Sequence, residues 1–384
     1  MALASGLLLL QARVPRISSL PGGPLLVAWL AVNLASSLCF APVLQISIRG
    51  LLLLLAGAIT LAVIPCLAAR SEMPVLPAYL NFWLLAIAVG IVGTAVDTFR
   101  GTALFSEQYF DVVLYRRTRG TFYEPNFYGI ASMMLGVISL DAWLSSESVR
   151  RRQPVPWRAL MCAIGVVISG TRSAQAAFAI GTLLTLVSHG HLTSLRRRDT
   201  ARATAIRVAL LALLTFAAGI LVLAGGAGNP YVRRLIVSLQ DPGSSSSLVG
   251  RLSQARAALT QVSTHFVLGY GTNTYGQLNP RMDAAGRPIY GALGASLFSL
   301  PLTLLYDTGI LGFSLAAAWL AVHHMAAFRA VGGRGTDYLW SFSLASVLMF
   351  ATFVTTNGMM LSFPWVHMGM TVFLIWQARH KNYG

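Results

Sequence analysis

Long apolar runs separated by short polar connections recur along the whole chain. A helix that crosses a bilayer needs about 20 predominantly apolar residues, and ten segments reach or approach that length. The ten predicted spans are 24–41, 50–69, 76–97, 122–145, 156–171, 173–188, 205–224, 300–326, 338–356 and 360–378. The pattern predicts an all-α, polytopic membrane helix bundle with about ten spanning helices. The apolar residues near the N-terminus could add one or two helices, for a total of eleven or twelve.

Composition supports one membrane domain over residues 1–384. Hydrophobic residues make up 55% of the chain and charged residues only 10%, a balance that excludes a soluble globular domain. Residues 225–299 are the one long polar stretch, with glycine, proline and a serine run at 244–247. We predict that this stretch is a large extramembrane loop within the single domain.

Arginine placement sets the expected orientation. The net charge of +16 comes almost entirely from arginine, and in a membrane protein such charge favours loops that meet anionic lipids rather than nucleic acid. Arginine clusters at 150–158 and 196–207 lie on either side of the tight helix pair 156–171 and 173–188. Short basic loops stay in the cytoplasm, so both termini are expected there. The connection after residue 97, the turn at Arg172 and the 225–299 loop are then expected to face outward.

Four arginines break this bias, because they lie in short connections on the predicted outer side: Arg116, Arg117, Arg119 and Arg172. Guanidinium groups bind phosphate oxygens bidentately and stay charged at physiological pH. An outward anionic ligand would explain them, and anchoring to lipid headgroups is the alternative. Glu124-Pro125-Asn126 follows the first cluster and is typical of a helix start with an Asn or Glu cap, where backbone N–H groups also favour anions.

Further candidates lie later in the chain. An amphipathic helix is predicted from Gly250 onward, carrying Arg251 and Arg256 and ending near His265. Three more polar candidates are Asn126, at the helix start, Asp307, near the outer end of the 300–326 span, and His367, inside the last span. Cys39, Cys66 and Cys162 fall in apolar segments without metal-ligand spacing, so no metal site is expected.

Four motifs stand in order between residues 110 and 330. They are the Arg-Gly-Thr-Phe-Tyr-Glu-Pro-Asn element at 119–126, the arginine turn at 168–173, the loop from Gly250-Arg251 to Leu268-Gly269-Tyr270-Gly271, and the Asp-Thr-Gly-Ile-Leu-Gly element at 307–312. In order, spacing and topology this set resembles the bacterial O-antigen ligase and polymerase superfamily.

The resemblance implies a glycosyltransferase of the bacterial inner membrane, acting on its outer face. The donor would be a glycan on undecaprenyl pyrophosphate, and arginines would stabilise the charge that develops on the leaving pyrophosphate. The implied chemistry needs no cofactor and no metal. The expected partners are lipid-linked oligosaccharides, membrane lipids, and a chain-length regulator and flippase of the same pathway.

One departure from the family favours a polymerase. Family ligases carry a His-Asn pair eleven residues before Gly309, and the histidine is usually assigned as the base; here those positions hold Phe298 and Ser299. We therefore predict Glu124 as the base. The predicted catalytic residues are Glu124, Arg172 and Arg251. The predicted pyrophosphate ligands are Arg116, Arg117, Arg119, Arg172, Arg251 and Arg256.

Two other functions stay open. A ligase would attach finished glycan to a lipid A-core or other acceptor. A transporter or flippase of an anionic lipid-linked glycan would require an inverted repeat, broken helices and intramembrane charges, and no such pattern is evident in the sequence.

Overall fold

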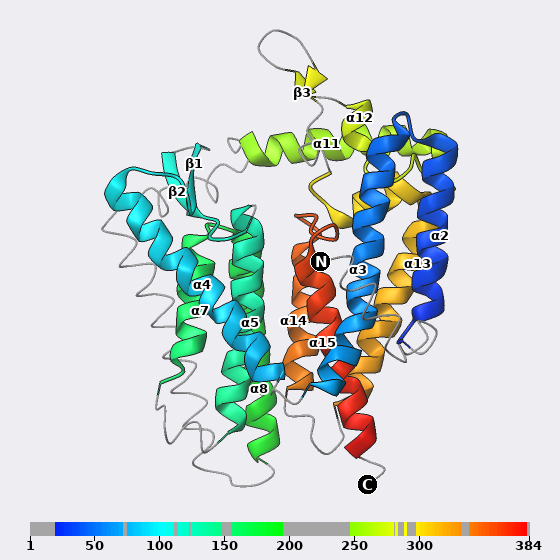
Figure 1. The fold of residues 1–384 in the computed structure, drawn as a ribbon. Helices are drawn as coiled ribbons and strands as arrows, with labels where there is room; N and C mark the ends of the chain where they lie inside the picture. Colours follow the sequence, from blue (N-terminus) through cyan, green and yellow to red (C-terminus); the bar gives the residue numbers. More distant parts are fainter. Residues whose placement is uncertain are drawn as a thin grey trace. The chain divides into compact units, whose positions relative to one another are not determined.

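The computed structural model of the chain describes residues 20–71, 75–110, 114–122, 124–146, 155–194, 246–279, 281–282, 288–289, 297–331 and 338–381. Their architecture is a set of apolar helices, with two short β-hairpins added (Figure 1). This confirms the predicted all-α membrane class. Among the described residues, five helices are long and apolar enough to cross a membrane, so the predicted count of ten is not confirmed. The predicted span 205–224 and residues 225–245 lie outside the described residues.

The five candidate spans are α2 (Gly23–Phe40), α3 (Leu44–Arg70), α4 (Val75–Arg100), α5 (Pro125–Ser145) and α13 (Leu300–Ala330). The other helices are α7 (Trp157–Ile168), α8 (Arg172–Ser194), α11 (Ser246–Val262), α12 (Tyr275–Leu278), α14 (Leu339–Thr352) and α15 (Ser362–Lys381), with a 3-10 turn, η3, at Ser263–His265. The hairpins pair β1 (Ser106–Phe110) with β2 (Leu114–Thr118) and β3 (Arg281–Met282) with β4 (Pro288–Ile289), both antiparallel.

Several predicted boundaries were wrong, mainly at polar ends. The 50–69 span begins earlier, at Leu44, and the 173–188 span continues to Ser194, because helices extend beyond the apolar stretch that hydropathy detects. The 122–145 span begins later, at Pro125, whose fixed φ and missing N–H suit the first helical turn. The chain before it, predicted only as a loop, contains the β1–β2 hairpin.

The chain forms two compact units. Unit 1 comprises residues 1–72, 250–339 and 353–384, and unit 2 comprises residues 73–249 and 340–352. Unit 1 therefore combines the two ends of the chain with the segment that carries α11 and α13. Unit 2 holds α4, the β1–β2 hairpin, α5, α7 and α8, together with α14.

Tryptophans and glycines hold the helices of unit 1 together. Trp319 of α13 stacks on Trp29 of α2, with ring centroids 5.8 Å apart, and on Trp365 of α15, at 5.6 Å. Gly57 of α3 lies against the Trp365 ring, where a Cβ atom would come closer than 3.0 Å. The small residue lets α3 and α15 approach closely, as in many membrane helix pairs.

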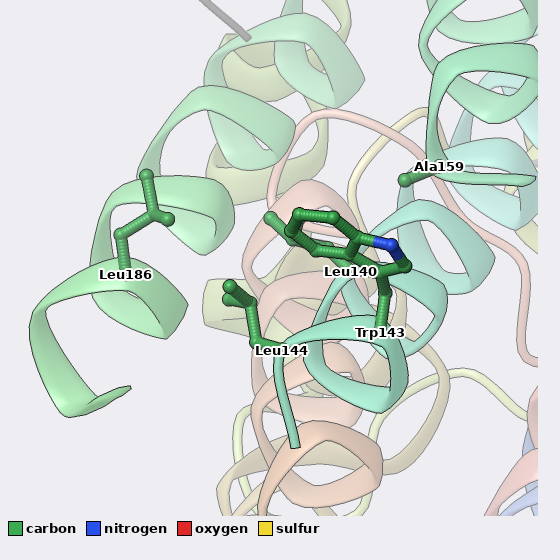
Figure 2. Close-up of a cluster of buried hydrophobic side chains, with 5 residues drawn as sticks. All are labelled: Leu140, Trp143, Leu144, Ala159 and Leu186. Carbon is green, nitrogen blue, oxygen red and sulfur yellow. The ribbon is translucent and has the colours of Figure 1, made fainter. Parts of the chain in front are cut away.

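α5 is the central helix of unit 2. Nearly all of its side chains are buried, in keeping with a sequence that is apolar on every side. Figure 2 shows the core near its C-terminal end, where Trp143 and its α5 neighbours lie between α7 and α8. The cluster consists of Leu140, Trp143, Leu144, Ala159 and Leu186. Because α5 is enclosed, its N-terminal end is fixed against the turn that joins α7 to α8.

α13 is broken at Gly309, which has φ 61° and ψ −168°, a conformation essentially restricted to glycine. The loop after α11 fills the break: Tyr270 N and Gly271 N donate to the carbonyls of Tyr306 and Asp307. On the other side, Ile310 N donates to Phe266 O. This is a single break, and the pattern expected of a transporter is broken helices in matched halves of the chain. The peptide groups freed by the break are paired with protein backbone, as the bilayer requires.

Candidate functional site

The arginine cluster lies on and beside strand β2. Arg116 and Arg117 pair across the hairpin with residues 108 and 107. The backbone N–H groups of Arg119 and Gly120 both donate to Phe105 O, at 3.0 and 2.9 Å, which closes the hairpin base. Gly120 has φ 57° and lies against the Tyr128 ring. This fixed base holds the three arginines next to the start of α5.

Arg117 is buried, with 7% of its surface exposed, and it joins three segments of unit 2. Its Nε donates to Ser169 O at 2.9 Å, and its Nη2 donates to Asn126 Oδ1 at 2.8 Å and to Thr171 Oγ1 at 3.1 Å. Thr171 Oγ1 in turn donates to Pro125 O at 3.3 Å. The structure thereby brings together two motifs that are about 50 residues apart in the sequence, the 119–126 element and the 168–173 turn.

Arg116 and Arg119 bind the loop that precedes β1. Arg116 Nη1 donates to Thr102 O and, at 3.2 Å, to Ser106 Oγ. Arg119 Nη2 donates to Ala103 O and Leu104 O at 3.3 and 3.2 Å. Both guanidinium groups are half-exposed. They remain accessible to a ligand while the loop carbonyls restrict their positions.

Glu124 immediately precedes α5, but its side chain forms no helix-capping hydrogen bond. Its carbonyl oxygen instead accepts from Phe127 N at 3.2 Å. The prediction that the Glu124 or Asn126 side chain caps α5 is therefore wrong. Asn126 uses its Oδ1 for Arg117, and its Nδ2 donates to Glu124 Oε2 at a long 3.5 Å. The half-buried Glu124 carboxylate lies beside the Arg117 network without a direct ion pair to it.

Arg172 is the first residue of α8, and its side chain is exposed. In the part of the chain that the structure describes, its guanidinium has no hydrogen bond or ion pair. It directly follows Thr171, which the Arg117 network fixes. An exposed cation on a fixed backbone position is suited to binding a ligand.

Unit 1 holds the second group of predicted residues. The Arg251 guanidinium lies over the Phe298 ring, 5.6 Å from its centroid, a cation–π contact. Arg256 is exposed on the same helix, α11. His265 closes η3 and packs between Phe40 and Tyr270, with ring centroids 4.8 and 4.5 Å away.

Asp307 and His367 are buried in unit 1. Asp307 Oδ2 accepts from Asn273 N at 2.9 Å, and the Asp307 carbonyl accepts from Ser36 Oγ and Gly271 N, each at 2.8 Å. Asp307 thus holds the loop against the break in α13. His367 is fully buried within α15.

Sequence reasoning did not single out Arg117 as the connecting arginine or predict the Gly269–Gly309 contact. The sequence does contain a signal for the role of Arg117. Side chains alternate between faces in a strand, so adjacent Arg116 and Arg117 must point to opposite sides. The convergence of Arg119 and Arg172 with Arg251 stays a prediction, since these residues belong to different units.

Comparison with known proteins finds a family similarity for part of the chain. Residues 158–317 match the family model described as O-antigen ligase, and no curated protein matches the chain. The matched region contains Arg172, Arg251, Arg256, His265 and Asp307. The Arg117 network joins it to the hairpin and to α5, which precede it. The apolar helices indicate a membrane protein, and the similarity of residues 158–317 to this family supports the O-antigen ligase and polymerase superfamily.

Proposed function

We propose that the protein polymerises oligosaccharide repeat units carried on undecaprenyl pyrophosphate, at the outer face of the bacterial inner membrane. In unit 2, Arg119 and Arg172 bind the pyrophosphate of the donor. Arg117 holds the β1–β2 hairpin and the α7–α8 turn together beneath them. Arg251 and Arg256 are candidate ligands from unit 1.

The proposed reaction is a single glycosyl transfer. The hydroxyl group of the acceptor glycan attacks the anomeric carbon of the donor, the new glycosidic C–O bond forms, and the C–O bond to the pyrophosphate breaks. The hydroxyl proton passes to the Glu124 carboxylate, and the lipid pyrophosphate leaves as an anion. Arginines near the leaving group stabilise its developing charge without losing their own. The implied donor is already activated, so the reaction needs no nucleotide.

The observation that carries the polymerase assignment is the contact between Phe298 and Arg251. Phe298 occupies the position where the family's ligases are expected to carry a histidine, and its ring packs against a candidate pyrophosphate ligand. A phenyl ring cannot accept a proton from a hydroxyl group. This supports a polymerase with another base over a ligase of the usual type.

The test uses a strain that lacks the gene and carries plasmid-borne variants. We expect Arg172→Ala and Arg251→Ala to abolish the ladder of long glycan chains while the protein still inserts in the membrane. Arg329→Ala, an exposed arginine in the last turn of α13, is the matched control and should leave the ladder intact. Normal chain lengths in both site variants would refute the pyrophosphate role.

The base is tested separately. Glu124→Gln keeps the size and polarity of the side chain but cannot take up a proton, so polymerisation should fall strongly. If polymerisation persists in this variant, Glu124 is not the base, whatever the arginine variants show.

The ligase function is the alternative, because the matched family model is itself described as O-antigen ligase. Glycans from the deletion strain separate the two. Loss of the ladder with single repeats still attached to their acceptor indicates a polymerase, and loss of all attachment indicates a ligase.

A further inference from the structure

Asp97, in the last turn of α4, is a fully buried carboxylate that the proposed reaction does not use. It accepts five hydrogen bonds, all from residues 102–106. Its Oδ1 accepts from Thr102 Oγ1 at 2.6 Å and Leu104 N at 3.1 Å. Its Oδ2 accepts from Phe105 N at 2.6 Å and from Ser106 N and Oγ at 2.8 and 2.9 Å. All five donors are neutral, and together they offset the cost of burying the charge.

The same loop, residues 102–106, also binds the arginine cluster. Four of its residues donate to Asp97, while the carbonyls of Thr102, Ala103 and Leu104 accept from Arg116 or Arg119. The Phe105 carbonyl accepts from the backbone of Arg119 and Gly120. The 103–104 and 104–105 peptide groups therefore lie between the Asp97 carboxylate and the Arg119 guanidinium, an arrangement in which hydrogen bonds strengthen one another.

Ser106 links Asp97 directly to one of the arginines. Its hydroxyl donates to Asp97 Oδ2 and accepts from Arg116 Nη1 at 3.2 Å. The charge of Arg116 is thus offset by a carboxylate one hydroxyl away. Arg119, in contrast, has only backbone carbonyl partners among the described residues. Its uncompensated charge is the one left for an anionic ligand.

We propose that Asp97 is a positioning residue: its carboxylate fixes the loop 102–106, and the loop carbonyls hold Arg116 and Arg119 ready for the donor pyrophosphate. This inference rests on the proposed function, in which Arg119 binds that group. A simple loop anchor would affect only the stability of the protein. A positioning residue also affects donor binding, and it does so through Arg119.

The experiment measures KM and kcat of the purified full-length protein with a lipid-linked repeat unit as donor. Asp97→Asn places an amide where only acceptors fit, and we expect the donor KM to rise about tenfold with kcat changed less. Asp97→Asn combined with Arg119→Ala should be no worse than Arg119→Ala alone, because coupled residues are not additive. Asp141→Asn is the matched control. It removes a buried carboxylate of unit 2 that contacts His189 at 2.7 Å and, in the described part of the chain, no arginine, so the donor KM should not change.

A second variant and a second measurement guard against misfolding. Ser106→Ala removes only the hydroxyl between Asp97 and Arg116 and should raise the donor KM by a smaller factor. Inorganic pyrophosphate should raise the melting temperature of the wild type more than that of either variant. An unchanged donor KM in Asp97→Asn, or fully additive effects with Arg119→Ala, would overturn the positioning role. If Arg119→Ala itself leaves the donor KM unchanged, the proposed function fails at this residue and the inference fails with it.

Discussion

Three arginines within four positions of the chain have different surroundings. Arg117 is buried and donates to three acceptors on two other segments. Arg116 is linked through Ser106 to Asp97, and Arg119 holds two loop carbonyls while half-exposed. Because every guanidinium carries the same charge, the arginines differ only in burial and in hydrogen-bond partners. Arg117 stabilises the fold, whereas Arg119 and the exposed Arg172 are accessible to an anionic ligand.

The first prediction concerns Arg117. Arg117→Ala removes the guanidinium donors to the buried Ser169 carbonyl, to Asn126 Oδ1 and to Thr171 Oγ1, so we expect the free energy of unfolding to fall by about 2–3 kcal/mol. Arg117→Lys should not restore it, because an ammonium group lacks the planar fork that reaches three acceptors. Arg172→Ala should change stability by less than about 0.5 kcal/mol. Thermal unfolding in detergent measures the stability of all three variants. Equal melting temperatures for Arg117→Ala and Arg172→Ala would contradict the structural role of Arg117.

At the scale of elements, the break in α13 is the distinctive feature of unit 1. Gly269 and Gly309 both have positive φ, and their backbones approach so closely that a Cβ atom on either would lie less than 3.0 Å from backbone atoms of the other segment. Asp307 reinforces the contact through Asn273 N. The break thereby connects the end of α11, the helix of Arg251, to α13.

The second prediction tests this contact between elements. Gly309→Ala introduces both a forbidden backbone conformation and a clash with Val267, and we expect at least about 3 kcal/mol of destabilisation. Gly250→Ala is the control: Gly250 lies in α11 with no neighbouring atom within 4 Å of the added Cβ, and removing a helical glycine should gain up to about 1 kcal/mol. Thermal unfolding compares the stabilities of the two variants. An unchanged melting temperature for Gly309→Ala would contradict the prediction that the break requires glycine.

At the scale of the whole molecule, the apolar helices indicate a membrane protein, and residues 158–317 are similar to the O-antigen ligase family. The arginines predict that the connection after residue 97 and the turn at Arg172 face outward. In unit 2, residue 121 is close to the start of α5, while residue 155 precedes α7, which runs toward the same turn that Arg117 contacts. The two positions therefore lie at opposite ends of this unit.

The third prediction uses these two positions. In a background without Cys39, Cys66 and Cys162, Thr121→Cys should react with a membrane-impermeant thiol reagent in spheroplasts, and Val155→Cys should react only after permeabilisation. Both residues are exposed, so accessibility within the protein does not bias the comparison. The reverse labelling pattern would show that the predicted topology is wrong and that the arginine cluster faces the cytoplasm.

The sequence by itself determined the class of the fold and indicated the superfamily. Apolar run length depends on composition alone, and so the spans near 24–41, 76–97 and 300–326 were recognisable without a structure. Motif order between residues 110 and 330 depends on residue types and spacing, and it predicted the superfamily that the match at 158–317 supports.

Only the tertiary structure decided how those motifs are used. Burial of Arg117 depends on Ser169 and Thr171, which are more than 50 residues away, and no local pattern encodes such contacts. The break at Gly309 exists because a distant loop supplies hydrogen-bond partners for its freed peptide groups. Hydropathy averages over a window and cannot detect it. Charge and apolar length are properties of residues in sequence, whereas a partner for a buried polar group is a property of residues brought together in space.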